Sequence, residues 1–287
     1  MCSSDLEPSN SPMKERIRIP AYPVQKLGGM LYAYLGPAPA PLLPRWDVVA
    51  WERGRRWIDV QSMLACNWLQ AMENSVDPSH LYWLHGVTAH LAREVGHYEE
   101  EHEFLPFDYG IMKRRTTPPR KPGDKPSVDQ HPLLFPNTLR HVSKSKVTGR
   151  IQHNLQCRLP VDDTHTQVYV IYFEPSDEHT PADADVPISP VPLRNAEGEY
   201  RLDQVLVQDA MAWETQGAIA DRSLENLGSA DRGIAMYRRL VRDQITTVQA
   251  GRDPLGVVRD ANIARLIELD VINERIGLMT PQHQAVA

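Results

Sequence analysis

Residues 67–86 read NWLQAMENSVDPSHLYWLHG, and the rest of the chain is organised around this stretch. It places two histidines, His80 and His85, among tryptophan, leucine, methionine and valine side chains. Apolar residues at this density belong in a protein interior, where histidine and acidic side chains are seldom buried without a partner. Either histidine alone would be read as an ordinary core residue. Both on one aromatic-rich segment predict half of a metal site.

The spacing of the two histidines constrains the local backbone. Residues five apart on a helix are displaced by roughly 140° around its axis. Both rings therefore reach one ion only if the helix breaks, tightens or bulges between them. Pro78 would lose a backbone hydrogen bond in mid-helix, so we expect it to start a new helix with Asp77 as the N-cap. A helix cap is also the ordinary interpretation of Asp77.

The pattern Glu73-Asn74-x-x-Asp77-x-x-His80-x-x-x-x-His85 resembles the iron motif of Rieske non-haem iron ring-hydroxylating oxygenases and matches it at every fixed position. Further segments resemble the phthalate dioxygenase branch of that family, namely residues 21–37, 159–166 and 208–234. The resemblance extends over the chain from about residue 14 onward. It implies the C-terminal catalytic domain of an α subunit with a truncated Rieske domain.

The fold class implied by the resemblance is α+β. It is a helix-grip (START/Bet v 1-like) antiparallel sheet wrapped around a long C-terminal helix and preceded by a remnant β-hairpin of a Rieske domain. Residue patterns favour the same elements, because alternation predicts strands and a 3.6-residue period predicts helices. The expected elements are a hairpin over residues 16–35, strands at 153–159 and 166–173, helices at 205–216 and 229–249, and long loops at 118–132 and 175–200.

Three segments are expected along the chain. Residues 1–13 are interpreted as a disordered or artefactual N-terminus, residues 14–44 as the remnant of a Rieske domain with its linker, and residues 45–287 as the non-haem iron catalytic domain. In the family, C-x-H and C-x-x-H loops hold the [2Fe-2S] Rieske cluster. None of the three cysteines here is followed by histidine at either spacing. The cluster is thus expected in a full-length parent, with no ligands in this chain.

The resemblance implies one mononuclear Fe(II) bound by His80, His85 and a carboxylate from a distant helix. Two histidines and one carboxylate on one face of the ion leave positions open for oxygen and substrate. The family takes its third ligand from the helix that opens near Gln208, so Asp209 is chosen and Glu214, about one turn further on, is the reserve. The ordinary role of Asp209 would be a first-turn acid that complements the helix dipole.

Asp77 and Asn74 are the other candidate catalytic residues. Asp77 lies three residues before His80 and can accept the ring N–H of an iron-bound imidazole, which orients that ligand. In the family, the matching aspartate also bridges to the Rieske histidine of a neighbouring subunit in a ring-shaped trimer. Asn74 matches an asparagine near the iron, and Glu73 is interpreted as structural or part of the bridge.

Guanidinium groups suit bidentate pairing with a carboxylate. The arginines considered as a clamp for a substrate carboxylate are Arg114, Arg115 and Arg140.

The implied function is an oxygenase catalytic domain that uses Fe(II) and O₂ to hydroxylate, dihydroxylate or O-dealkylate an aromatic substrate, including carboxylated ones. Electrons would come from NAD(P)H through a reductase, with or without a ferredoxin, and the expected assembly is a homotrimer. Two alternatives stay open. One is a non-catalytic helix-grip ligand-binding domain that lacks its Rieske electron donor. The other is a hydrolase that activates water on zinc.

Composition excludes several partners. The 287 residues carry a net charge of −6, with 41% hydrophobic and 24% charged residues, which is typical of a globular enzyme. Scattered basic residues give no reason to expect nucleic acid. No apolar run is long enough to predict a membrane span. Three cysteines make no disulfide framework and favour a cytoplasmic location.

Overall fold

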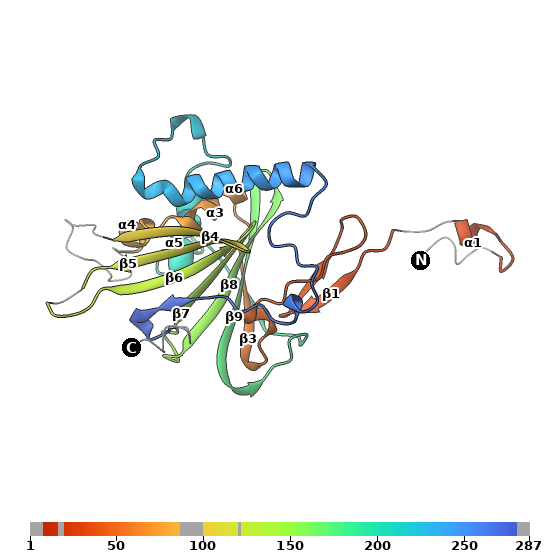
Figure 1. Ribbon diagram of the computed structural model, residues 1–287, viewed down its shortest axis with the longest axis horizontal. Coiled ribbons are helices and arrows are strands. Elements are labelled where there is room, and N and C mark those ends of the chain that lie inside the picture. The colour runs from red at the N-terminus through yellow and green to blue at the C-terminus, as the bar shows by residue number, and fades with distance from the viewer. Residues whose placement is uncertain (1–7, 17–19, 87–99, 120–121, 280–287) are drawn as a thin grey trace.

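The computed structural model describes residues 8–16, 20–86, 100–119 and 122–279. Most of the strands belong to one large sheet, and the longer helices lie on one side of it (Figure 1). The strands of the large sheet are β3 (Arg53–Gln61), β4 (Glu101–Phe107), β5 (Gly110–Thr117), β6 (Ser127–Leu134), β7 (Thr138–Lys144), β8 (Ile151–Asp162), β9 (His165–His179), β10 (Ile188–Val191) and β11 (Ile272–Asn273). A separate hairpin contains β1 (Val24–Leu27) and β2 (Met30–Ala33).

The helices are unequal in length, and α6 is the longest of those described. They are α1 (Met13–Arg16), α2 (Asp47–Ala50), α3 (Trp68–Glu73), α4 (His80–Gly86), α5 (Val205–Glu214) and α6 (Arg232–Gln249). Single 3₁₀ turns are η2 (Asn74–Val76), η3 (Arg222–Leu224), η4 (Ser229–Asp231), η5 (Ile263–Arg265) and η6 (Glu274–Ile276). No helix within the described ranges has both the length and the apolar character needed to cross a lipid bilayer.

The strand order of the large sheet is β10-β3-β9-β8-β7-β6-β5-β4, with β11 added beside β6. Every described pair in it is antiparallel except β10 with β3, which is parallel. A mixed α/β fold with a large, mainly antiparallel sheet agrees with the predicted fold class.

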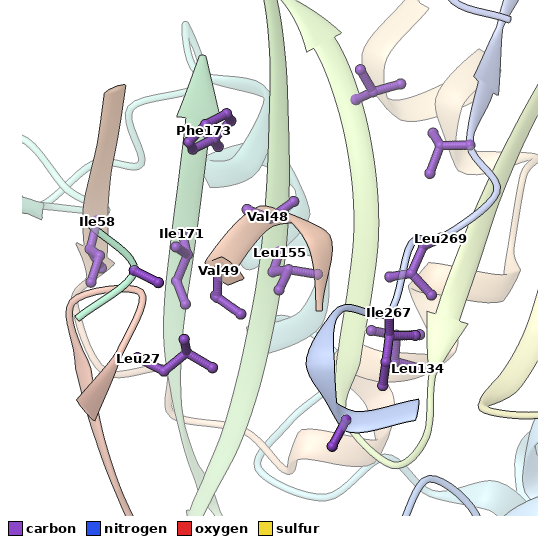
Figure 2. Packing of buried hydrophobic residues seen from close by; sticks show 14 of the residues in the cluster. Leu27, Val48, Val49, Ile58, Leu134, Leu155, Ile171, Phe173, Ile267 and Leu269 are labelled. Carbon is purple, nitrogen blue, oxygen red and sulfur yellow. The ribbon is translucent and has the colours of Figure 1, made fainter. Parts of the chain in front are cut away.

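The two faces of the sheet pack against different partners, because successive residues of a strand point to opposite sides. Figure 2 shows one face, where Ile171 and Leu155 lie near Val48 and Val49 of α2, and Ile267 of the C-terminal segment lies beside Leu134 in the same cluster. The opposite face packs against α3, α5 and α6. There, Val168 and Val170 of β9 join a second cluster with α3 and α5, and a third cluster forms beneath η2 and α6.

The hairpin prediction was correct at its centre and wrong at its start. Gly28 and Gly29 have φ angles of 62° and 85°, which glycine adopts at little cost, and they join β1 to β2 as expected. The strand expected from Arg16 instead starts at Val24, and α1 precedes it. Residues 1–7 of the predicted N-terminal segment lie outside the described residues.

Two expected loops contain strands. In the segment 118–132, β6 begins at Ser127, and in the segment 175–200, β9 continues to His179 and β10 pairs with β3. β6 and β10 each contain a proline, Pro132 and Pro190, which hides these strands from a pattern reading. Pro190 is tolerated in β10 because β10 is an edge strand.

Close contact between α6 and η2 depends on Gly233. A Cβ there would lie 2.4 Å from the carbonyl oxygen of Val76 and 2.4 Å from the ring of Phe104. We expect Gly233→Ala to lower the free energy of unfolding by about 1–3 kcal/mol, as overpacking does, measured by urea denaturation. Exposed Ala235→Gly on the same helix reports the intrinsic preference for alanine, about 1 kcal/mol. A Gly233→Ala variant more stable than the wild type would mean that the contact between α6 and η2 accommodates an added methyl group.

Candidate metal centre

Asp77 caps α4 as the sequence predicts. Its carboxylate accepts hydrogen bonds from the backbone N–H groups of Ser79 (2.8 Å) and His80 (3.2 Å). The Ser79 hydroxyl also donates to it. Pro78 follows the cap, where its missing N–H costs nothing. These bonds fix His80 in the first turn of the helix.

The carbonyl of Ser79 accepts hydrogen bonds from the Tyr82 N–H at 3.0 Å and from the Trp83 N–H at 3.2 Å, a shared acceptor that is common at helix ends. The backbone is α-helical from His80 to Gly86, so the predicted break, tightening or bulge between the two histidines does not occur. The ring centroids of His80 and His85 lie 5.3 Å apart, with an interplanar angle of 81°. The two imidazoles therefore face a common space despite their five-residue spacing.

The third member of the cluster comes from α5. Asp209 Oδ1 lies 3.2 Å from His85 Nε2 and 3.7 Å from His80 Nε2. One ligand atom from each of the three residues lies within 4.8 Å of the other two, and this is the one such group within the described ranges. His85 and Asp209 are buried, and His80 is nearly so. The structure thus brings together the three residues predicted as metal ligands.

The reserve ligand Glu214 lies elsewhere. Its carboxylate accepts hydrogen bonds from the Ala65 N–H at 2.7 Å and from the Tyr200 hydroxyl at 2.5 Å. Glu73 is bound by Arg238 and Arg222 at 2.7 and 2.6 Å, which agrees with a structural role.

The donor set fits a divalent cation. His85 Nε2 is buried and makes no hydrogen bond within the described part of the chain, although the Asp209 carboxylate is close. A buried polar atom without a partner is costly. An ion at the point shared by the three residues would satisfy it, and two imidazoles with one carboxylate are typical of non-haem Fe(II).

Both acids at the centre are held as carboxylates. Burial by itself raises the pKa of Asp209, but the contact with His85 and the nearby charge of His80 outweigh burial, so the pKa is lowered. Burial likewise opposes ionisation of Asp77, and its bonds with His80 and Ser79 lower its pKa. Asp77 Oδ2 lies 3.4 Å from His80 Nδ1, so Asp77 faces the candidate ligand while it caps the helix.

Gln208 is a site residue that sequence reasoning missed. Its Oε1 lies 2.7 Å from His85 Nδ1, and its Nε2 donates to the carbonyl of Leu202 at 2.6 Å. Because the amide oxygen can only accept, His85 carries its proton on Nδ1 and turns Nε2 toward Asp209. Adjacent helix residues point in different directions, so the position of Gln208 next to Asp209 in the sequence did not indicate that Gln208 would contact His85.

We expect Gln208→Leu to weaken Fe(II) binding by about 10- to 100-fold, the usual effect of removing a group that orients a metal-bound histidine. Competition titration against a chelator of known affinity measures it. Gln208→Glu keeps the acceptor and should retain most of the affinity, and exposed Gln216→Leu should bind like the wild type. Equal affinity for Gln208→Leu and the wild type would mean that Gln208 does not orient His85.

Asn74 lies at the centre as well. Its Nδ2 donates to Asp209 Oδ1 at 3.3 Å. A cavity of about 270 Å³ adjoins this side, and its lining includes Asn74, Asp77, His80 and Arg238. The two predicted catalytic residues therefore border both the metal centre and a cavity.

The three candidate arginines are not gathered at one place. Arg140 is 1% exposed, binds both carboxylate oxygens of Asp47 and lies on the sheet face that packs against α2, away from α3, α5 and the metal centre. Arg115 binds Asp129 through Nε at 2.8 Å. Arg114 is partly exposed, with Nε 3.8 Å from Glu103.

The fold and the site together define a mixed α/β domain with a candidate mononuclear metal site, made of two histidines and one aspartate. Residues 197–274 match the family model described as LigXa C-terminal domain like. The chain is 37% identical over 267 residues to the 5,5'-dehydrodivanillate O-demethylase oxygenase subunit of Sphingobium sp., covering 91% of this chain and 60% of the relative. It is 26% identical to the phthalate 4,5-dioxygenase oxygenase subunit of Pseudomonas putida, covering 93% of this chain and 68% of the relative.

Solved structures support the fold. NdmA of Pseudomonas putida CBB5 (QL mutant, with theobromine) aligns with a TM-score of 0.55 at 16% identity, over 83% of this chain and 67% of NdmA. Both sequence relatives are oxygenase subunits, one of them of a phthalate dioxygenase, which agrees with the resemblance seen in the sequence. The chain spans about 60% of the length of the demethylase subunit.

Proposed function

We propose that this chain is the catalytic part of an oxygenase subunit that acts on an aromatic substrate with O₂ and a mononuclear Fe(II). The observation that carries the proposal is the convergence of His80, His85 and Asp209 on one buried point. The products would be a hydroxylated ring, a cis-dihydrodiol or an O-dealkylated phenol. Relatives named as a demethylase and a dioxygenase support that range.

His80, His85 and Asp209 would hold the ion. A ferrous ion so bound supplies the site for reductive activation of O₂. Each of the three candidate ligands has its own polar neighbour. Asp77 faces His80, Gln208 fixes His85, and Asn74 donates to Asp209. These contacts would orient the three candidate ligand atoms toward a bound ion, as hydrogen-bonded neighbours of metal ligands do.

Electrons would enter beside Asp77. Asp77 and His80 line the cavity next to the centre. A donor docked in that cavity would contact Asp77, whose Oδ2 lies 3.4 Å from Nδ1 of the candidate ligand His80. We propose that the donor is a Rieske cluster from a neighbouring subunit in a homotrimer, reduced by NAD(P)H through a reductase. In this reading, residues 45–287 are the catalytic domain with a helix-grip arrangement around α6. Residues 14–44, with the β1–β2 hairpin, would be the remnant of a Rieske domain.

Metal analysis and spectroscopy test the proposal. The chain is purified without oxygen and supplied with Fe(II), and nitric oxide is added as a probe. We expect one iron per chain and the S = 3/2 electron paramagnetic resonance signal of a ferrous nitrosyl centre, both lost in His85→Ala. Preferential retention of zinc, with hydrolytic activity, would instead support the hydrolase. Iron and ligand binding without turnover, when a reductase, a Rieske donor, NADH and O₂ are supplied, would support the non-catalytic alternative.

A further inference from the structure

A second cavity lies on the sheet face that packs against α2, away from the metal centre. Its volume is about 400 Å³, which is in the range of cavities that hold small molecules. None of its lining residues also lines the cavity at the metal centre. The lining residues of the sheet, of the segment after α2 and of the C-terminal segment include Arg140, His153, Trp51, Leu269, Val271 and Leu278.

The buried charged groups of this cavity neutralise each other. Arg140 and Asp47 are each 1% exposed, and Arg140 Nε lies 3.0 Å from Asp47 Oδ1. Arg140 Nη1 also donates to the carbonyl of His141 at 2.7 Å. A ligand carboxylate would have to compete with Asp47 for the guanidinium, so the pair gives an anion little to bind.

His153 brings an unpaired donor to the cavity. It is 8% exposed, and its Nδ1 lies 2.8 Å from Arg140 Nη2. Because a guanidinium only donates, Nδ1 is the acceptor and the proton of the neutral ring is on Nε2. Burial and the charge of Arg140 lower the pKa of His153 to about 3, so the ring is neutral at physiological pH. Within the described ranges, Nε2 makes no hydrogen bond, and it is the ring atom left to bind a ligand.

The walls around this donor are apolar. Leu269 and Val271 belong to the hydrophobic cluster on this face, part of which is seen in Figure 2. Trp51 and Leu278 pack against the same cluster. The ring of Trp51 meets the ring of His153 edge to face, with centroids 5.0 Å apart. Apolar walls with one or a few polar groups that fix orientation are typical of small-molecule sites.

Acidic side chains border the cavity on its solvent side. Glu268 and Asp270 line it and are exposed, and Asp270 Oδ2 accepts a hydrogen bond from Gln130 Nε2 at 2.9 Å. Because Asp47 and Arg140 cancel, these two acids give the lining an excess of negative charge, which disfavours an anion. An ammonium ion would be attracted to the acids but has no acceptor to offer the N–H of His153.

We propose that this cavity binds an uncharged, largely apolar compound whose carbonyl oxygen accepts a hydrogen bond from His153 Nε2. The carbonyl would satisfy the buried donor, and the apolar part would lie against Trp51 and the C-terminal segment, where it is removed from water. The site lies on the other face of the sheet from the metal centre. It therefore goes beyond the proposed oxygenase function and does not depend on it.

Calorimetric titration with four probes of similar size tests the ligand class. The probes are acetophenone, which has a carbonyl, ethylbenzene, which has no acceptor, the anion benzoate and the cation benzylammonium. We expect acetophenone to bind the wild type at least about 3-fold more tightly than any of the other three, the effect of one additional hydrogen bond. The metal-free chain is used, so that the result is independent of iron.

His153→Phe tests the donor, because phenylalanine keeps an aromatic ring and removes the N–H. The affinity for acetophenone should fall about 3- to 10-fold, and the affinity for ethylbenzene should change by less than about 2-fold. Thermal unfolding shows whether the variant is folded. If it is not, the four probes on the wild type and the cavity-filling variant below still decide the proposal.

Leu278→Trp tests the location by filling the cavity without changing the donor, and it should abolish acetophenone binding. Leu266→Trp is the matched control on the same segment, because Leu266 is 43% exposed and does not line the cavity. Leu84→Trp narrows the cavity at the metal centre instead. Both of these variants should bind acetophenone like the wild type.

Four results would overturn the carbonyl site. They are equal affinity of the wild type for acetophenone and ethylbenzene, tighter binding of benzoate or benzylammonium, unchanged acetophenone affinity in folded His153→Phe, and wild-type affinity in Leu278→Trp. Loss of acetophenone binding in Leu84→Trp alone would place the ligand at the metal centre and would also overturn it. Iron loading of the wild type is measured separately, so this site and the oxygenase proposal can fail independently.

Discussion

Asp209→Asn is expected to lower the affinity for Fe(II) by more than about 100-fold, because loss of a mere orienting partner already costs about 10- to 100-fold. Asp209 Oδ1 lies 3.2 Å from His85 Nε2 and 3.7 Å from His80 Nε2, so no other described acid is placed to replace it. Asparagine keeps the size of the side chain but removes the negative charge that offsets the ion. Chelator competition and the nitrosyl signal measure the loss.

Glu214→Gln is the matched control, because Glu214 is the other acid considered on α5. The Glu214 carboxylate accepts hydrogen bonds from the Ala65 N–H and the Tyr200 hydroxyl. Because it does not contact the metal centre, the iron affinity of Glu214→Gln should stay within about 2-fold of the wild type. If Glu214→Gln loses iron while Asp209→Asn retains it, the ligand assignment is reversed. Circular dichroism on both variants confirms that the fold is intact.

Asp47→Ala is expected to lower the free energy of unfolding by about 3–5 kcal/mol, the effect of breaking a buried ion pair from one side. Asp47 and Arg140 are each 1% exposed. Arg140 binds the carboxylate through Nε at 3.0 Å and Nη2 at 3.1 Å, and the same carboxylate accepts a hydrogen bond from the Val48 N–H in the first turn of α2 at 2.7 Å. Without Asp47, a buried guanidinium loses its counter-charge and the Val48 N–H loses its acceptor. Urea denaturation at constant pH measures the change.

Two comparisons show whether the buried pair is responsible. Asp47→Ala combined with Arg140→Met should recover much of the lost stability, because the uncompensated charge is then removed. Asp185→Asn breaks the exposed pair with Lys26 and should cost at most about 1 kcal/mol. A loss below about 1 kcal/mol for Asp47→Ala would show that water or another group solvates Arg140 in the variant.

Features set by near neighbours in the chain were predictable. The cap by Asp77 and the helix start after Pro78 both depend on bonds within one helical turn. The turn at Gly28-Gly29 is equally local. Asp209 was different, since the residues alone left it an ordinary first-turn acid and only the family resemblance selected it.

The sequence by itself determined which residues carry metal-binding chemistry and where the helix that bears the two histidines begins, because those properties depend on side-chain type and on hydrogen bonds between close neighbours. Tertiary structure alone decided their partners. Asn74 meets Asp209 across 135 positions, and Arg140 meets Asp47 across 93. Such pairings depend on which face of a strand or helix each side chain occupies, and that is settled only when the sheet and helices pack.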